Sequence, residues 1–471
     1  MEWEKLLCSD RIRGVKAKTN GNDLRTEFEK DYHRIIGSAS FRRLQDKTQV
    51  FPLDKSDFVR TRLTHSLEVS SFAKSMGQNI SRKIMSVIRD ESFLPEYQID
   101  VCDILQCAGL LHDIGNPPFG HFGETVIRDW FVKNMPQLCF QGKPLTECLN
   151  EQMQNDFYHF EGNTQALRLV TKLHYLVDAH GMNLTKALLG TIIKYPVSSL
   201  EIDKKSGDIH TKKMGYYYAE RDIFKDLQES LGTHGRRHPL AFVLEAADDI
   251  AYKTADIEDA FKKGCISYDQ LLEELRRFGE DEPENEDYQQ IVNQLERKYN
   301  QAVERGIQKP DTYAVQNWTV LVQGKLIFHA TDSFVEHYDE IMAGTYQKEL
   351  LTKEHGKKIA DALGDIAYRY AFTSAPIYKL EIAAETILNS LLDKYVNAAI
   401  NYDTDVAMTA VQVKLMALLS DNYKTIYQIY SKDCDEYEKL YLRLLLVTDS
   451  ICGMTDSHAK RLYQEFCGIE V

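Results

Sequence analysis

Apolar residues recur at spacings of three and four over several long segments, and this periodicity restricts the fold more than any other feature. The pattern is strongest in residues 64–82, 100–111, 240–262 and 377–399. An α-helix turns once every 3.6 residues, so this spacing gathers the apolar side chains on one face. The sequence therefore predicts an all-α, mainly helical fold.

Strand patterns are scarce and predict only one or two short β-hairpins. Segment 200–218 contains a Ser-Gly-Asp turn flanked by two short strand candidates, and residues 319–326 form a second candidate. The acidic segment 279–287 holds one proline and no apolar residue, which predicts a loop. We expect it to separate a core, residues 1–278, from a C-terminal helical region, residues 288–471.

The composition excludes several classes of protein. With 43% hydrophobic and 27% charged residues, the chain has the balance of a globular protein. Its formal net charge of −14 argues against broad coating of nucleic acid, which relies on a basic surface. No segment approaches the ~20 apolar residues of a membrane span, and the N-terminus lacks a signal-peptide pattern. Nine cysteines without a CxxC motif are typical of reduced thiols, so we expect a cytoplasmic protein.

A His-Asp pair follows directly on one of the apolar helices. His112 and Asp113 come after the run 104–111, and Gly-Asn-Pro-Pro follows at 115–118. Proline lacks the amide proton that a helix needs and restrains the residue before it, so the helix should end here. A His-Asp pair at the last turn of a helix can face a cavity. Taken alone, such a dipeptide is more often a buried pair without a catalytic function.

Two further features favour a metal site. His65 opens a predicted helix behind two arginines, and Asp248-Asp249 lies inside an otherwise apolar helix. Adjacent acids are costly to bury unless they are paired or bind a metal. Imidazole and carboxylate ligands without a thiolate suit Mn, Fe, Zn or Mg.

These residues belong to an ordered set of motifs that covers roughly residues 10–260. Besides His65, His112-Asp113 and Asp248, the set contains FEKDYHRII (28–36), SFRRLQDKTQVF (40–51), RLTHSLEV (62–69), HDIGNPPFGHFGE (112–124), FEGN (160–163), KYP (194–196) and EAADDIAY (245–252). In this order the motifs resemble those of the deoxyguanosine triphosphate triphosphohydrolases (dGTPases), a branch of the HD-domain phosphohydrolases. A single His-Asp pair is weak support for a family, whereas the ordered set is strong.

The resemblance implies that His65, His112, Asp113 and Asp248 hold a divalent metal. Mn²⁺ or Mg²⁺ is expected, with Fe, Co and Zn as alternatives. Asp249 competes with Asp248, which we favour because it lies four residues before Tyr252, on the same helix face. The reaction implied is hydrolysis of dGTP, or of several dNTPs, to deoxynucleoside and tripolyphosphate by attack of water on the α-phosphorus.

The same resemblance assigns roles around the substrate. His121 and Glu124 are expected to be the catalytic pair, with His121 protonating the leaving 5′-oxygen. Cationic side chains should meet the phosphates, and Lys212 competes with Lys213 for this role. The expected phosphate-binding residues are Arg62, Lys194 and Lys213.

An enzyme for deoxynucleotides must also exclude a 2′-hydroxyl. Tyr252 is expected to pack against C2′, with Gln49 bonding the 3′-hydroxyl and Val50 beside the sugar. Three further residues are expected to belong to the site: Asn163, Tyr195 and Asp256. Glu381 or Glu385 is a candidate for reading guanine, although a solvated helix face is the favoured interpretation of both.

Several alternatives stay open from the sequence. The chain could be an HD-family phosphodiesterase, a 5′-deoxynucleotidase, or a regulator that binds nucleotides or single-stranded DNA. Guanosine tetraphosphate hydrolases are disfavoured because residues 116–118 are Asn-Pro-Pro where those enzymes carry an acidic pair. The resemblance further implies a homo-oligomer, a hexamer being one form, and an effector that is single-stranded DNA or a nucleotide. Residues 288–471 would complete the substrate pocket and the oligomer interface.

Overall fold

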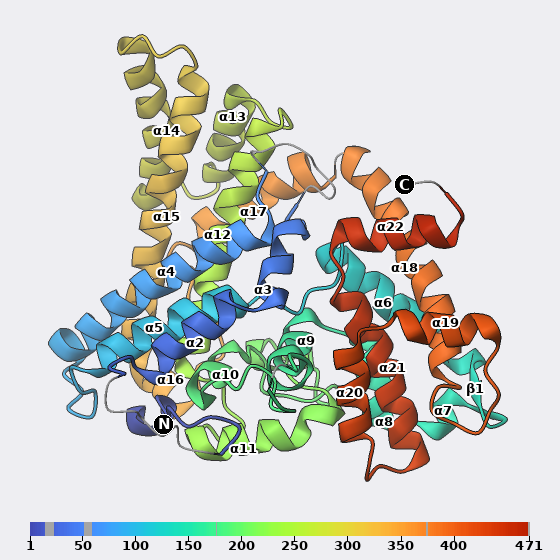
Figure 1. Ribbon diagram of the computed structural model, residues 1–471. Coiled ribbons are helices and arrows are strands. Elements are labelled where there is room, and N and C mark those ends of the chain that lie inside the picture. The colour runs from blue at the N-terminus through green and yellow to red at the C-terminus, as the bar shows by residue number, and fades with distance from the viewer. Residues whose placement is uncertain (15–22, 51–58, 176, 374, 470–471) are drawn as a thin grey trace.

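The computed structural model describes residues 1–14, 23–50, 59–175, 177–373 and 375–469. Helices dominate the described chain (Figure 1), which confirms the predicted all-α class. The N-terminal half contains α1 (Trp3–Leu6), α2 (Glu27–Ile36), α3 (Ala39–Arg43), α4 (Arg62–Lys83), α5 (Tyr97–Leu111), α6 (Gly120–Asn134), α7 (Leu145–Cys148), α8 (Glu151–Tyr158), α9 (Gly162–Arg168), α10 (Lys186–Ile192) and α11 (Arg221–Leu231). The remainder contains α12 (Pro239–Lys262), α13 (Tyr268–Gly279), α14 (Glu286–Glu304), α15 (Pro310–Glu336), α16 (Tyr338–Ala343), α17 (Lys357–Ala367), α18 (Ala375–Ala399), α19 (Ala410–Leu418), α20 (Asp421–Tyr430), α21 (Glu436–Cys452) and α22 (Asp456–Phe466).

Helices α4, α5 and α12 pack on one another. The contact between α4 and α5 is close because glycine stands at the crossing. A Cβ on Gly109 would lie 2.5 Å from the Cα of Ser70, so only glycine lets the two backbones approach this far. The crossing brings the first turn of α4 and the last turn of α5 toward the same face of α12.

The chain leaves α5 as the sequence predicts. His112 is the C-cap of α5, and the Gly-Asn-Pro-Pro step separates it from α6. Phe119, the N-cap of α6, has a φ of +64°, in the left-handed region that non-glycine residues rarely adopt. The segment between α5 and α6 is therefore a tight turn that needs support from its surroundings.

The C-terminal helices are built onto this core. Helix α15 packs on α4 and α12, and α18 packs on α6, α21 and α22. A buried guanidinium, that of Arg168, bonds to Asp449 on α21 at 2.7 Å and to Glu220 at 2.9 Å. Residues 280–285 join α13 to α14 within the predicted acidic loop. The division into residues 1–278 and 288–471 stays a prediction.

Two strand predictions are wrong. Within the described segment 200–218 there is no strand, because the carboxylate of Asp203 accepts the amides of Lys205 and Ser206 and turns the backbone. Residues 319–326 lie inside α15, whose apolar period runs over 27 residues and outweighs the short strand-like window. The described chain contains one hairpin, between β1 (Cys139–Phe140) and β2 (Lys143–Pro144).

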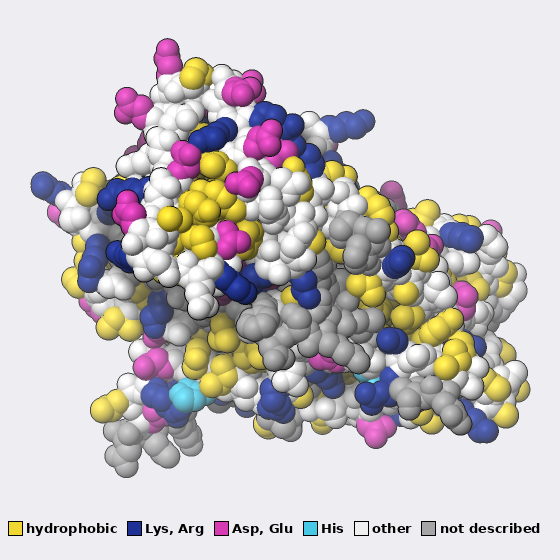
Figure 2. All heavy atoms as spheres, turned by 90° about the horizontal axis from the view of Figure 1, so that it is seen from above, with side chains coloured by type: hydrophobic (Ala, Val, Ile, Leu, Met, Phe, Trp, Pro, Cys, Tyr) yellow, Lys and Arg dark blue, Asp and Glu magenta, His cyan; other side chains and the backbone are white. Residues whose placement is uncertain are grey.

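The structure also gives the state of the cysteines, the apolar length of the helices and the distribution of surface charge. All the cysteines are free thiols. No helix in the described ranges is long and apolar enough to cross a membrane. Viewed from above, side chains of both charges are interspersed with apolar ones (Figure 2), so the net charge of −14 does not make this face uniformly acidic.

Candidate metal centre and catalytic site

The four expected metal ligands come together from three helices. His65 lies in the first turn of α4, His112 and Asp113 follow the end of α5, and Asp248 lies in the middle of α12. Nε2 of His65 is 3.2 Å from Oδ1 of Asp248, and Nε2 of His112 is 3.4 Å from the same oxygen. Nε2 of His112 is also 3.5 Å from Oδ2 of Asp113. Residues up to 183 positions apart in sequence thus present ligand atoms to one small volume.

The structure separates the two adjacent acids of α12. Asp248 contacts both histidines, whereas Asp249 turns toward Lys253, one helical turn away, at 3.4 Å. Neighbouring residues on a helix point about 100° apart, so only one of the pair can face the cluster. Asp248 is the one that does.

Two buried cations balance the carboxylates of the cluster. Nη1 of Arg62 lies 2.5 Å from Asp113, and Nζ of Lys194 lies 2.7 Å from Asp248. Burial alone would raise the pKa of Asp113, but the guanidinium of Arg62 and the imidazole of His112 lower that pKa well below its usual range. The pKa of Asp248 is likewise lowered against the effect of burial, first by Lys194 and then by His112. Both acids are therefore ionised and available as ligands.

The donor set fits a divalent cation. Nδ1 of His112 lies 2.7 Å from the carbonyl oxygen of Gly109, which makes Nδ1 the donor and leaves Nε2 directed at the carboxylates. Among the described residues, this buried Nε2 has no hydrogen-bond partner. Ligand atoms of His65, His112 and Asp113 all lie within 4.8 Å of one another. Two imidazoles and two carboxylates are typical ligands of Mn, Fe, Co or Zn.

His121 and Glu124 form a second cluster, at the start of α6. Nδ1 of His121 is 3.1 Å from Oε2 of Glu124; the imidazole is 65% exposed and the carboxylate only 2%. The other oxygen of Glu124 accepts the amide of Gly162 at 2.8 Å. Burial would raise the pKa of Glu124, but His121 lowers it to about 2, and Glu124 in turn raises the pKa of His121. An accessible, easily protonated imidazole is therefore held by a buried anion.

Glu161 was not predicted as a site residue from the sequence, yet it bonds to two of the expected substrate-binding residues. Its Oε1 accepts Nζ of Lys213 at 2.8 Å and Nδ2 of Asn163 at 2.9 Å. Lys212, the competitor of Lys213, instead bonds Glu349. Its position in the FEGN motif could have identified Glu161 as a site residue, because an acid that is buried needs a polar or cationic partner.

The residues expected around the sugar and base range from buried to exposed. Val50 and Tyr195 are buried, and Oε1 of Gln49 has no hydrogen-bond partner among the described residues. The ring of Tyr252 lies parallel to that of Phe372, with 6.1 Å between centroids. Burial raises the pKa of Asp256 well above its usual range. Of the two guanine-reading candidates, Glu381 is half-buried and Glu385 is exposed.

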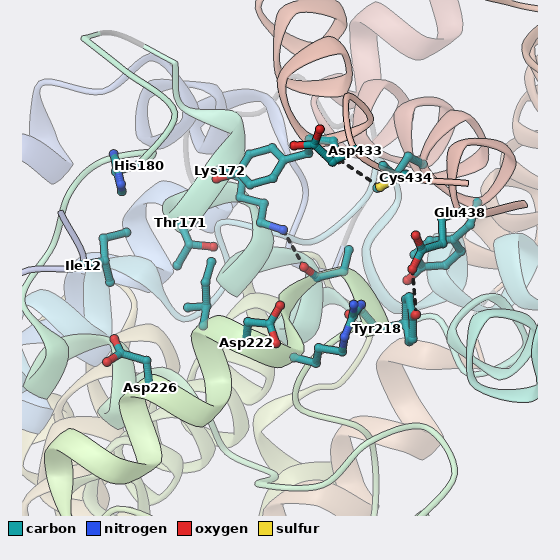
Figure 3. A pocket seen from close by; sticks show the side chains of 16 residues that line it. Ile12, Thr171, Lys172, His180, Tyr218, Asp222, Asp226, Asp433, Cys434 and Glu438 are labelled. Atoms are coloured by element: carbon teal, nitrogen blue, oxygen red, sulfur yellow. Dashed lines mark hydrogen bonds between the residues drawn. The ribbon is translucent and has the colours of Figure 1, made fainter. Parts of the chain in front are cut away.

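A separate cavity of about 540 Å³ lies between the N-terminal half and helices α20 and α21 (Figure 3). Its lining includes Lys172, Tyr218, Asp222, Asp433 and Glu438. None of the residues expected at the catalytic site lines this cavity. Lys172 already donates to the carbonyl oxygen of Ala219, and Tyr218 to Glu438. The cavity is therefore not part of the metal cluster.

Comparison with known proteins agrees with the ordered motifs. Residues 62–143 match the model of the HD domain. A deoxyguanosinetriphosphate triphosphohydrolase-like protein of Listeria monocytogenes is 47% identical over 474 residues, covering 100% of both chains. Deoxyguanosinetriphosphate triphosphohydrolases of Yersinia enterocolitica and Salmonella schwarzengrund are 31% and 33% identical, with at least 94% of each chain covered. The chain therefore belongs to the deoxyguanosinetriphosphate triphosphohydrolase family of HD-domain proteins.

Proposed function

We propose that this protein hydrolyses dGTP to deoxyguanosine and tripolyphosphate. One observation carries the proposal: the cluster of His65, His112, Asp113 and Asp248, whose atoms approach to 3.2–3.5 Å, has the donor chemistry of a divalent metal site. The names of the full-length relatives supply the substrate. Other dNTPs are further candidate substrates.

The four clustered side chains would hold the metal, which we propose to be Mn²⁺ or Mg²⁺, with Fe, Co and Zn as the alternatives. When bound, the metal would lower the pKa of a water molecule and neutralise charge on the phosphoryl oxygens. The protein itself fixes the ligands: Gly109 orients His112, and Nδ2 of Asn116 donates to Asp113 at 2.6 Å. These bonds set the direction of the donor atoms before any substrate arrives.

His121 would act as the general acid. The 5′-oxygen of a nucleoside is a poor leaving group, so protonation of that oxygen as the P–O bond breaks lowers the barrier. The 65% exposure of the imidazole leaves it accessible to substrate, and Glu124 stabilises its protonated form. Glu124 would therefore orient and charge His121 without contacting the phosphate.

Three cations are available for the triphosphate. Tripolyphosphate carries about four negative charges near neutral pH, so a site that binds it needs cationic partners. Arg62 and Lys194 already lie beside the metal cluster, and Lys213 lies beside Glu161. We propose that all three side chains contact phosphate oxygens of the substrate. Each cation would then interact with the phosphate and with its carboxylate partner at the same time.

Tyr252 would discriminate deoxyribose from ribose. Its ring stands one helical turn after Asp248 on α12, so a sugar beside the metal would lie against it. Gln49 offers a buried oxygen, without a hydrogen-bond partner in the described part of the chain, for the 3′-hydroxyl, and Val50 supplies an apolar wall. Asn163, Tyr195 and Asp256 would complete the pocket. Glu381, which is half-buried where Glu385 is exposed, would be the candidate for reading guanine.

Product identification tests the proposal. The purified protein is incubated with each dNTP and with Mn²⁺ or Mg²⁺, and the products are separated by ion-exchange chromatography. Deoxyguanosine and tripolyphosphate are expected from dGTP. Monophosphate with pyrophosphate would show cleavage of the bond between the α- and β-phosphates and would contradict the proposal. Cleavage only of cyclic nucleotides or 5′-monophosphates, supplied in parallel reactions, would favour a phosphodiesterase or a 5′-deoxynucleotidase.

The His121→Ala variant separates metal binding from acid catalysis. We expect it to keep the metal while kcat falls by roughly 10²–10⁴-fold, because the leaving oxygen then departs without a proton donor. Metal analysis and initial rates measure the two effects. Full activity of this variant would exclude the role of His121.

Assembly and regulation remain predictions from family resemblance. We propose a homo-oligomer, with a hexamer as one form, and an effector that is single-stranded DNA or a nucleotide. Light scattering measures the oligomeric state. The effect of an effector is measured by comparing hydrolysis rates with and without an added oligonucleotide or second nucleotide.

A further inference from the structure

Asp456, the first residue of α22, bonds to two segments of the N-terminal half, one at Thr48 and one at Phe119. Its Oδ2 accepts the amide of Thr48 at 2.9 Å and the hydroxyl of Thr48 at 2.6 Å. Its Oδ1 accepts the amide of Phe119 at 2.9 Å. The carboxylate is buried, and 408 and 337 residues separate it from these partners. Both carboxylate oxygens of Asp456 therefore accept hydrogen bonds from the N-terminal half.

The two segments carry groups with different roles in the proposed reaction. Thr48 directly precedes Gln49 and Val50, the residues proposed to meet the sugar. Phe119 lies two residues before His121, the proposed acid, and has the left-handed φ of +64°. Its amide would otherwise be an unsatisfied donor at the start of α6. A single side chain therefore links the sugar-side segment to the acid-side turn.

Lys47 forms a second link between the 46–50 segment, the turn after α5 and the C-terminal helices. Its buried Nζ donates to the carbonyl oxygen of Asn116 at 2.5 Å and to that of Cys452, at the end of α21, at 2.6 Å. This bond pair joins the turn after α5 to the C-terminal helices independently of Asp456. The junction between α21 and α22 thus holds the 46–50 segment and the 116–121 turn from one side.

We propose that Asp456 is a positioning residue for hydrolysis, which fixes His121 relative to the sugar-binding segment. This inference rests on the proposed function. The chemistry requires a carboxylate, because three N–H or O–H donors point at its two oxygens. Asparagine has one carbonyl oxygen, and its amide group would face donors on one of the two sides.

The Asp456→Asn variant tests the role, with Ser457→Ala as the matched control. Ser457 is the next residue of α22 and donates to Asp46 at 2.8 Å, so it is bonded to the same segment, whereas the bonds to Thr48 and Phe119 are made by Asp456. We expect Asp456→Asn to lower kcat for dGTP by about 10–10²-fold, as for other small displacements of a catalytic group. The control should keep kcat within about twofold, and both variants should bind the metal as the unsubstituted protein does.

A double-substitution cycle distinguishes positioning from general damage. If Asp456 acts through His121, adding Asp456→Asn to His121→Ala should lower kcat no further. Thr48→Val, which removes only the hydroxyl bond, should give a smaller loss and a raised KM. An unchanged kcat in Asp456→Asn, or the same fold loss with and without His121, would overturn the inference. Absence of hydrolysis by the unsubstituted protein would instead remove the proposed function, and this inference with it.

Discussion

His121 differs from the two clustered histidines in its surroundings. The imidazoles of His65 and His112 are 1% exposed and face carboxylates from other helices, whereas His121 is 65% exposed and its partner Glu124 is one turn along the same helix. Buried imidazoles with fixed orientation suit a metal, and an exposed imidazole beside a buried anion suits proton transfer. The three residues are all histidines, but their surroundings suit two of them to metal binding and the third to proton transfer.

The substitution Glu124→Gln should change the pH dependence of kcat. Glu124 is the main cause of the raised pKa of His121, so Glu124→Gln should lower that pKa. A general acid works only while protonated, and kcat falls as the pH rises through its pKa. The fall should therefore begin at lower pH in Glu124→Gln than in the unsubstituted protein. Rate profiles from pH 5 to about 10 measure it, and an unmoved alkaline limb would contradict the assignment.

The substitution Tyr252→Ala should weaken the discrimination between deoxyribose and ribose. Removing the ring of Tyr252 opens space beside C2′, so the ratio of kcat/KM for GTP to that for dGTP should rise by about tenfold or more. Tyr252→Phe keeps the ring and should keep the discrimination, which separates the steric effect from the hydroxyl. Continued refusal of GTP by Tyr252→Ala would exclude the steric role.

At the scale of elements, the start of α6 depends on a glycine. Gly120 has a φ of +61°, and a Cβ there would lie 2.3 Å from Nη2 of Arg62. Arg62 cannot move away freely, because it is bonded to Asp113. Space and backbone conformation thus both require glycine at the junction between the metal cluster and the catalytic helix.

Gly120→Ala should lower both stability and activity, with Gly142→Ala as its control. Gly142 has a φ of +79° in the hairpin turn, and a Cβ there meets nothing within 4 Å. The control should cost about 1–2 kcal/mol from backbone strain alone. Gly120→Ala should cost more and also lower kcat. Thermal unfolding and initial rates compare the two, and equal effects would show that the contact with Arg62 is unimportant.

The elements also show where prediction from sequence fails. The end of α5 at His112 was predictable because its cause is local: the prolines that follow cannot continue a helix. The strand predicted at 319–326 was wrong because a short window does not reveal the period of the 27-residue helix around it. Glu161 lies within the FEGN motif, yet its bond to Lys213 depends on packing between separate segments.

At the scale of the whole molecule, metal binding should be linked to folding. The proposed ligands come from α4, the end of α5 and α12, so an unfolded chain cannot present them together. Mn²⁺ at 100 times its Kd should raise the free energy of unfolding by about 2.7 kcal/mol, seen as a higher Tm. His112→Ala should lose this rise, whereas exposed His458→Ala should keep it. An equal rise in both variants would remove the metal assignment.

The sequence by itself determined the helical class, the end of α5 and the residue types of the site, because helix period and helix ends depend on residues close in the chain. Its ordered motifs also indicated the family to which the comparisons assign the chain. Only the tertiary structure decided that Asp248 rather than Asp249 faces the histidines, and that Asp456 reaches Thr48 and Phe119. These contacts join residues more than a hundred positions apart in the chain, and the packing of whole helices sets their distances.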